Sequence, residues 1–204
     1  MRSFSELAMT QRACRRFDPN ADVPDDDVVT MVSHAVHAPS AENKQPWEFV
    51  VVRSLEVRQA FGTMMREVWA LGGAEYVKAN ASPFVAADVT DGIAGGGLDT
   101  APVLIVVCAD LDKVLEVWSA ASIYPATQNL LLAAAQLGYG SCLTTGLTTA
   151  FADKVRERLA LPATLLPMAG IYVGRAAKPL APPRREPAEQ QLHREQFGNA
   201  WLSQ

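Results

Sequence analysis

The stretch that decides the fold is Ala38 to Trp47, which reads A-P-S-A-E-N-K-Q-P-W. It joins an apolar run with helical spacing to a β-rich run, and a connector that only turned the chain would use Gly, Asp or Asn. This one also carries the Ser40 hydroxyl and the carboxamides of Asn43 and Gln45. Carboxamides donate and accept hydrogen bonds, which suits the edge of a heteroaromatic ring. The alternative is a helix-ending loop in which Trp47 starts a buried strand.

The composition predicts one globular domain over residues 1–204. The chain is 49% hydrophobic, enough to form a core, and its net charge is −4 without a basic stripe, so we expect no nucleic acid partner. Its apolar runs are too short to cross a membrane, and the N-terminus lacks the apolar region of a signal peptide. The three cysteines are widely spaced, which argues against a disulfide framework or a zinc ribbon. The expected location is therefore cytoplasmic.

Hydrophobic periodicity predicts a regular alternation of helices and strands. Strands are expected at 49–52, 103–109, 140–146 and 167–173, and helices at 4–11, 25–38, 56–71, 119–137 and 151–159. The helix over 119–137 is apolar around nearly its whole circumference, which suggests packing between subunits, and Pro125 should kink it or mark its start. Gly138 is placed as its stop. The fold class is α+β, with a mixed sheet between layers of helices.

Two segments depart from this alternation. Residues 72–100 hold scattered glycines and Pro83, and we interpret them as a mobile excursion with one short helix near 75–81, either a substrate lid or an ordinary long loop. From Ala176 the chain is Pro-rich and charged, as is typical of a tail that wraps a neighbour or stays loose.

Several side chains are candidates for binding chemistry. Arg12, Arg15 and Arg16 would repel one another unless an anion such as phosphate lies among them or water screens them. Arg184 and Arg185 could reach the same anion or simply solubilise the tail. His34 and His37 lack zinc-site partners, and Cys142 lacks an identifiable base, so all three are interpreted as surface or packing residues. Neither a Rossmann nor a P-loop motif is present, but the glycines of 140–146 allow close backbone approach to a flat ring.

Taken in order, these pieces resemble the flavin-dependent nitroreductase family. The similarity runs through R-A-C-R-R-F at 12–17, the 38–47 segment, A-P-V at 101–103, Q-N-L at 128–130, the glycine turn at 138–140 and R-R-E-P at 184–187. Two positions depart from the family pattern: Gln11 stands where Arg is frequent, and Ala13 where Ser is frequent.

The resemblance implies a nitroreductase-like three-layer α/β/α sandwich, an intertwined homodimer and FMN sites at the subunit interface. It assigns the FMN phosphate and ribityl chain to Arg12, Ala13 and Arg15, with help from Arg16, Arg184 and Arg185. The partner subunit would supply Pro39, Ser40, Ala41, Asn43 and Gln45. Leu143, Thr144, Thr145 and Gly146 would lie against the ring, with a backbone N–H near Thr145 facing flavin N5. The tail, 176–204, would wrap the partner subunit.

The expected function is that of an FMN-dependent NAD(P)H oxidoreductase. NADH or NADPH would reduce FMN, and a nitroaromatic or quinone-type acceptor would then take the electrons in a ping-pong reaction; no catalytic side chain and no metal are expected. One alternative is another enzyme of this fold, either a flavin-consuming synthase or a reductive dehalogenase. Glu75, Tyr76 and Lys78 superficially resemble the Glu/Tyr/Lys lid of such dehalogenases. The other alternative is a protein that binds or stores flavin without turnover.

Overall fold

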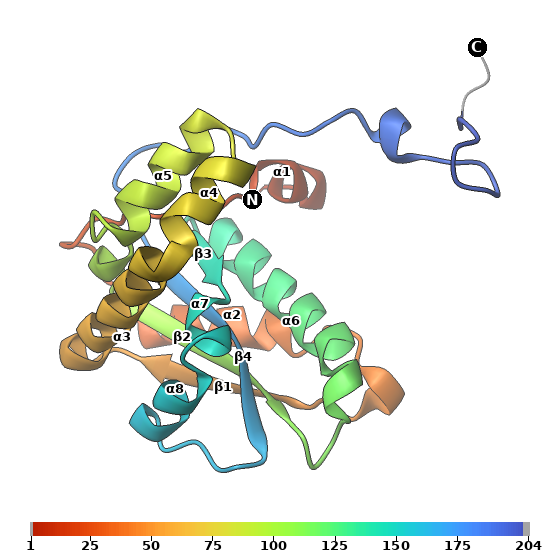
Figure 1. Cartoon of the computed structure of the whole chain (residues 1–204). Helices are drawn as coiled ribbons and strands as arrows, with labels where there is room; N and C mark the ends of the chain where they lie inside the picture. The colour runs from red at the N-terminus through yellow and green to blue at the C-terminus, as the bar shows by residue number, and fades with distance from the viewer. Residues whose placement is uncertain (1, 202–204) are drawn as a thin grey trace.

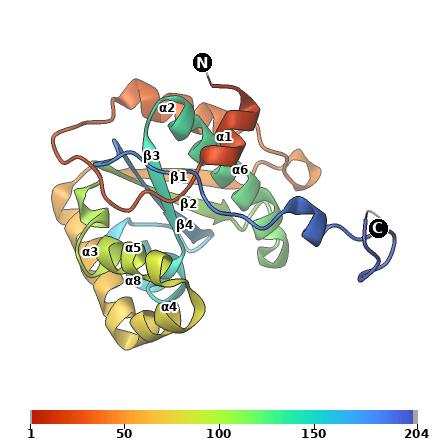
Figure 2. The same cartoon turned by 90° about the horizontal axis from the view of Figure 1, so that it is seen from above.

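A computed structural model describes residues 2–201, which form three layers around one sheet (Figure 1). Helices α2 (Asp25–Ala35) and α6 (Glu116–Gln136) cover one face. Helices α3 (Leu55–Val68), α7 (Gly146–Thr149) and α8 (Ala152–Arg158) cover the other. The view from above shows the two helical layers on opposite sides of the strands (Figure 2). The α+β class and the α/β/α layering are therefore confirmed.

The sheet has the strand order β1-β2-β4-β3. Its strands are β1 (Trp47–Val52), β2 (Val103–Asp110), β3 (Gly140–Thr144) and β4 (Leu165–Gly174). All three pairings are antiparallel, so the expectation of a mixed sheet is wrong for the described residues. The one parallel contact among these residues is an isolated bridge between Ala13 and Ser141. Strand direction depends on how the connections cross the sheet, which a hydrophobic pattern along one strand does not encode.

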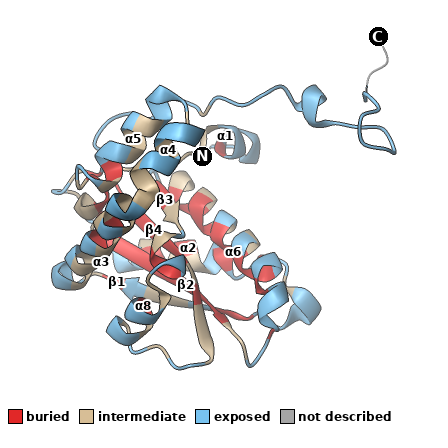
Figure 3. Cartoon of the chain, viewed as in Figure 1, coloured by how far each residue is buried: buried red, intermediate tan, exposed pale blue. Residues whose placement is uncertain are grey.

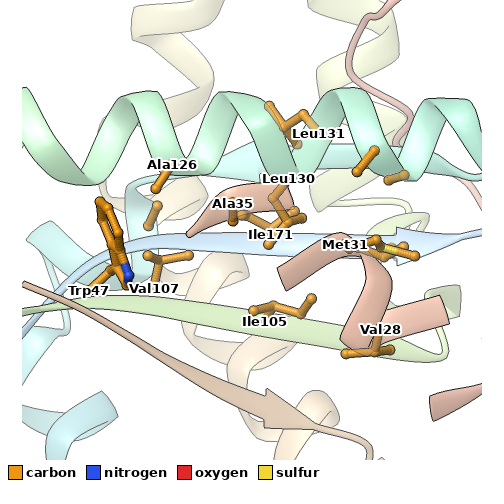
Figure 4. Close-up of a cluster of buried hydrophobic side chains, with 14 of the residues drawn as sticks. Val28, Met31, Ala35, Trp47, Ile105, Val107, Ala126, Leu130, Leu131 and Ile171 are labelled. Atoms are coloured by element: carbon orange, nitrogen blue, oxygen red, sulfur yellow. The ribbon is translucent and has the colours of Figure 1, made fainter. Parts of the chain in front are cut away.

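Strand β2 lies at the centre because its residues are apolar on both faces. Val103 to Ala109 are all buried, as their unbroken apolarity predicts. Ile105 and Val107 face α2 and α6 with Ile171 of β4 (Figure 4), whereas Leu104 and Val106 belong to the second core cluster. Burial is concentrated in the sheet and the inner helix faces (Figure 3).

Helix α6 runs for 21 residues through Pro125 without interruption. It begins three residues before the predicted start and ends at Gln136, and Gly138 follows with a φ of +88°, as a helix stop requires. Only one side of α6 is buried in the single chain, through residues such as Ile123, Ala126 and Leu130. The opposite side remains exposed and includes Val117, Trp118 and Tyr124.

The segment 72–100 is largely helical. Its first part is a π-helical turn, Trp69–Gly73, and then α4 (Ala74–Asn80), which corresponds to the predicted short helix. Its second part, α5 (Pro83–Ile93), was not predicted. Ser82 caps α5 by accepting a hydrogen bond from the Val85 N–H, and Pro83 occupies the first turn, where proline is tolerated. Proline here starts a helix rather than interrupting one.

Both ends of the described chain lie at the surface. The short helix α1 (Phe4–Thr10) is capped by Ser3 in a capping box with Glu6, and it packs against α6. The tail after Ala176 first runs beside residues 12–16 and then extends away from the layers, and its residues are almost all exposed (Figure 3). In residues 2–201, no helix is long and apolar enough to cross a bilayer.

The three cysteines are free and buried. Burial raises the pKa of the Cys108 thiol to about 12 and that of Cys142 to about 11. As pH rises, the thiols of the unfolded chain ionise from their ordinary pKa of 9.0, whereas the buried thiols of the folded chain stay protonated until higher pH. Their contribution to folding stability is therefore fully present below pH 9 and is lost as pH rises toward the folded-state values.

We expect the free energy of unfolding to fall as pH rises above about 9, by at most ~1.4 kcal/mol per pH unit for each thiol. Urea denaturation between about pH 8 and pH 10.5 measures this slope. Cys108→Ala should make the slope shallower, because one of the titrating groups is gone. Equal slopes for the two proteins would contradict this explanation.

Candidate functional site

The arginine segment, residues 12–16, lies between β3 and α5. The Cys14 N–H donates to the Ser141 carbonyl at 2.8 Å, and the Phe17 N–H donates to Thr100 Oγ1 at 2.9 Å. On its other side, the Ala177 N–H donates to the Arg16 carbonyl at 3.1 Å. The segment is therefore held in an extended conformation by contacts with three distant parts of the chain.

Close packing fixes the distance between this segment and β3. Gly140 lies directly against Cys14, and a Cβ at Gly140 would come within 2.7 Å of both Cys14 Cβ and Cys14 Sγ. Real Cβ atoms do not approach so closely, so only glycine allows this contact. The family resemblance assigns 12–16 and 143–146 to one ligand, and the structure brings both to the same strand, β3.

The end of β3 presents backbone rather than reactive side chains. Leu143 and Thr144 are half-buried, Thr145 is exposed, and Gly146 starts α7. A Cβ at Gly146 would lie 2.9 Å from Met65 Sδ, so the chain runs close over α3 at this point. Thr144 Oγ1 accepts a hydrogen bond from the Gly146 N–H at 3.2 Å, which fixes the turn.

The 38–47 segment contains a concentration of unusual backbone. Glu42, Asn43 and Gln45 all have positive φ, between 49° and 54°, and none of them is glycine. Ser40 Oγ accepts a hydrogen bond from the Gln45 N–H at 3.1 Å, which closes the turn. Residues held in this region cost of order 1–3 kcal/mol each and cluster at ligand-binding sites. Within the segment, Ala41, Asn43 and Gln45 are exposed, Ser40 is half-buried and Pro39 is exposed, so these groups are accessible to a partner.

The two halves of the predicted site lie far apart within one chain. The Ala41 N–H donates to Ser122 Oγ, early in α6, at 3.2 Å. The arginine segment instead contacts Gly140 and Ser141, beyond the other end of α6. About sixteen residues separate Ser122 from Gly138, which corresponds to roughly 24 Å along a helix axis. Figure 1 shows the 38–47 segment at the lower right and α5 at the upper left of the molecule.

The late arginines lie on the exposed tail. Arg12 Nη1 donates to the Ala181 carbonyl at 3.2 Å, so the tail starts beside the arginine segment. Arg184 and Arg185 follow shortly after Ala181, and Arg185 Nη1 donates to the Arg184 carbonyl at 2.8 Å. The structure thus places the start of the tail near Arg12.

Two carboxylates of α5 contact the arginines, and the sequence interpretation missed both. Asp88 Oδ2 lies 2.5 Å from Arg15 Nη1 and 3.8 Å from Arg12 Nη2. Asp91 forms a two-pronged ion pair with Arg16, which lowers the pKa of Asp91 through the hydrogen bonds from that guanidinium. Because 73 residues separate Arg15 from Asp88, no local pattern could connect them.

This geometry fits a phosphate group. A single anionic oxygen, Asp88 Oδ2, already lies within ion-pair distance of two guanidiniums. Arg12 and Arg15 are therefore oriented so that both can contact one oxyanion, as phosphate recognition requires. Neither the Gln11 nor the Ala13 side chain supplies a cation, so the positive charge here comes from Arg12, Arg15 and Arg16.

The other sequence candidates lie elsewhere. His34 on α2 and His37 in the turn after it are exposed, and their Nδ1 atoms contact the carbonyls of Thr30 and Ser33, respectively. Burial is the main reason that the pKa of the Cys142 thiol is raised, which disfavours the thiolate form. The dehalogenase-like residues lie on α4, namely Glu75, Tyr76 and Lys78. Within residues 2–201, no group of three or more His, Cys, Asp or Glu side chains could hold a metal ion.

Comparisons with known proteins agree with this fold. The nitroreductase family model matches residues 8–175. A protein of Methanothermobacter thermautotrophicus, named "Putative NADH dehydrogenase/NAD(P)H nitroreductase", is 28% identical over 179 residues, covering 85% of this chain and 77% of its own length.

Two solved structures share the fold. A BluB-like flavoprotein from Clostridium difficile 630 has a TM-score of 0.74 at 22% identity, with 96% of this chain and 100% of the other covered. A nitroreductase with bound FMN from Desulfitobacterium hafniense has a TM-score of 0.68 at 22% identity and the same coverage. The match of the family model over most of its length shows that the chain belongs to the nitroreductase family.

Proposed function

We propose that this protein is an FMN-dependent NAD(P)H oxidoreductase that acts as a homodimer on nitroaromatic or quinone-type acceptors. The observation that carries the proposal is the orientation of Arg12 and Arg15 toward one anionic oxygen. These arginines lie beside Gly140, at the start of β3. Membership of the nitroreductase family and the FMN-bound structural neighbour support the choice of flavin.

In this proposal the protein binds and orients the cofactor, and no side chain acts as an acid or a base. Arg12 and Arg15 hold the phosphate, while Leu143, Thr144, Thr145 and Gly146 lie under the ring with a backbone N–H near Thr145 directed at N5. Arg16, Ala13, Arg184 and Arg185 border the phosphate end. Bound FMN supplies hydride acceptance from NADH or NADPH and electron delivery to the acceptor.

The separation of the two site halves supports a dimer. Since Ser40 and Asn43 lie at the opposite end of α6 from the arginines, they reach an FMN phosphate-binding segment only in a second copy. An apolar groove of about 610 Å³ between α1, α2 and α6 offers a surface for that copy, and Phe4, Leu7 and Leu132 line it. The described part of the tail extends outward from the layers (Figure 1), and in this proposal residues 176–204 wrap the neighbouring subunit.

A direct test is to purify the protein, record its flavin absorbance and add NADH or NADPH without oxygen. We expect a yellow protein with about one FMN per chain, whose visible flavin absorbance bleaches on addition of a nicotinamide nucleotide and returns with a quinone or nitroaromatic acceptor. Protein that does not retain added FMN would overturn the proposal. Flavin that binds but does not bleach would favour a flavin-storage role.

We expect Arg12→Ala to weaken FMN binding because it removes a charged contact to the phosphate. Such a contact contributes roughly 1.5–3 kcal/mol, which corresponds to about 10- to 150-fold in Kd. Fluorescence titration measures the affinity, and riboflavin, which has no phosphate, is the control. An unchanged FMN Kd would place the phosphate elsewhere.

A further inference from the structure

Asp88 occupies the position in which the arginine segment would meet a phosphate. Its Oδ2 contacts Arg15 at 2.5 Å and Arg12 at 3.8 Å, and all three side chains are partly buried, with exposures of 36% for Asp88, 21% for Arg15 and 18% for Arg12. Partial burial reduces the screening of these charges by water. The carboxylate cancels one of the two positive charges, so the three side chains together carry one net positive charge.

Close packing sets the position of the α5 backbone that carries Asp88. Gly92 lies one turn after Asp88 on the same face of α5, and a Cβ there would lie 2.7 Å from Arg15 Cβ. Gly97 lies against the Arg15 carbonyl, where a Cβ would come within 2.3 Å of the oxygen. Helix α5 at Gly92, and the turn after it at Gly97, therefore pack their backbone directly on the arginine segment, which keeps the Asp88 backbone close to Arg15.

Asp91, the other carboxylate of α5 beside the arginine segment, contacts neither Arg12 nor Arg15 in a salt bridge. It forms its own ion pair with Arg16 on the outer side of α5, and the two side chains are about half exposed. That pair attaches α5 to the arginine segment independently of Asp88. Removing the Asp88 charge therefore leaves a second connection between the two elements in place.

We propose that Asp88 is an affinity-determining residue for the cofactor, an internal counter-anion that competes with the FMN phosphate for Arg12 and Arg15. The proposal rests on the proposed function and adds a role that opposes binding. An incoming phosphate dianion must share the two guanidiniums with a fixed carboxylate and is repelled by it. Through Asp88, helix α5 thus makes FMN binding weaker than Arg12 and Arg15 would make it without that carboxylate.

The test compares Asp88→Asn with the unaltered protein by fluorescence titration with FMN and with riboflavin. The introduced carboxamide retains an oxygen that accepts a hydrogen bond from Arg15 but has no charge. We expect FMN to bind about tenfold more tightly, with the gain shrinking at high salt, whereas riboflavin affinity stays the same. Asp88→Ser should behave likewise, and circular dichroism verifies that both variants are folded.

Glu75→Gln is the matched control, because it removes one negative charge from exposed α4 in the same segment. We expect it to leave FMN affinity unchanged. Weaker or equal FMN binding by folded Asp88→Asn would overturn the inference and show that Asp88 orients Arg15 or has no role. An equal gain for riboflavin would also overturn it. Failure of every protein, altered or not, to bind FMN would instead overturn the proposed function itself.

Discussion

A heterodimer of two flavin-deficient variants is expected to regain one FMN site of normal affinity. The first variant carries Arg12→Ala and Arg15→Ala, and the second carries Ser40→Ala and Asn43→Gly. Glycine is chosen for the second of these because Asn43 has a φ of 53°, which glycine adopts without strain. Each variant alone should lose FMN affinity by roughly 100-fold or more, because both of its sites are damaged.

Two different tags allow the mixed dimer to be purified after co-expression. If a site takes its arginines from one chain and its 38–45 residues from the other, one site carries all four changes and the other carries none. Titration should then give one FMN per dimer with unaltered affinity. If each site were formed within one chain, every site in the mixed dimer would be damaged. The mixed dimer would then bind FMN as weakly as either variant alone.

Leu130→Ala is expected to lower the free energy of unfolding by about 3 kcal/mol. Leu130 is fully buried on the side of α6 that faces the sheet, within the cluster drawn in Figure 4. Shortening this side chain leaves a cavity that the surrounding sheet and helix cannot easily fill. Denaturant titration measures the loss, which should not depend on protein concentration.

Leu132→Ala is the matched control on the same helix. Leu132 is only partly buried and lines the groove between α1, α2 and α6. We expect its truncation to raise the dissociation constant of the dimer, so that the variant separates into single chains at protein concentrations where the unaltered protein and Leu130→Ala remain paired. Analytical ultracentrifugation over a dilution series measures this, and an unchanged dissociation constant for Leu132→Ala would contradict the assignment of the groove to the subunit interface.

Much of the fold follows from local patterns in the sequence. The unbroken apolar run at 103–109 identified the buried central strand, and Gly138 identified the end of α6. Ser3 and the acidic residues at 25–27 lie at helix starts, as capping and dipole effects require. These features are determined by neighbours within a few residues, so periodicity and capping suffice to predict them.

The errors arose where structure depends on distant contacts. Helix α5 was missed because Pro83 and the nearby glycines are typical of loops, yet Ser82 and Pro83 form a good helix start. The antiparallel arrangement depends on connections across the sheet. Asp88 was missed for the same reason, since only the packing of Gly92 on Arg15 brings it to the arginines.

The site predicted from the resemblance divides into two parts in the structure. Residues 12–16 and 143–146 do converge on β3, whereas 39–45 lie at the other end of α6. A sequence cannot show that two segments belong to different copies, because it has no information about symmetry. The strained backbone at Glu42, Asn43 and Gln45 likewise emerges only from the geometry.

The central claim is that two copies of this chain hold FMN between them. Native mass spectrometry of the purified protein after incubation with FMN tests this most directly, because it measures chains and cofactors in one particle. We expect a particle of two chains carrying two FMN molecules, and no single chain carrying flavin. A single chain that retains FMN, or a pair that retains none, would contradict the claim.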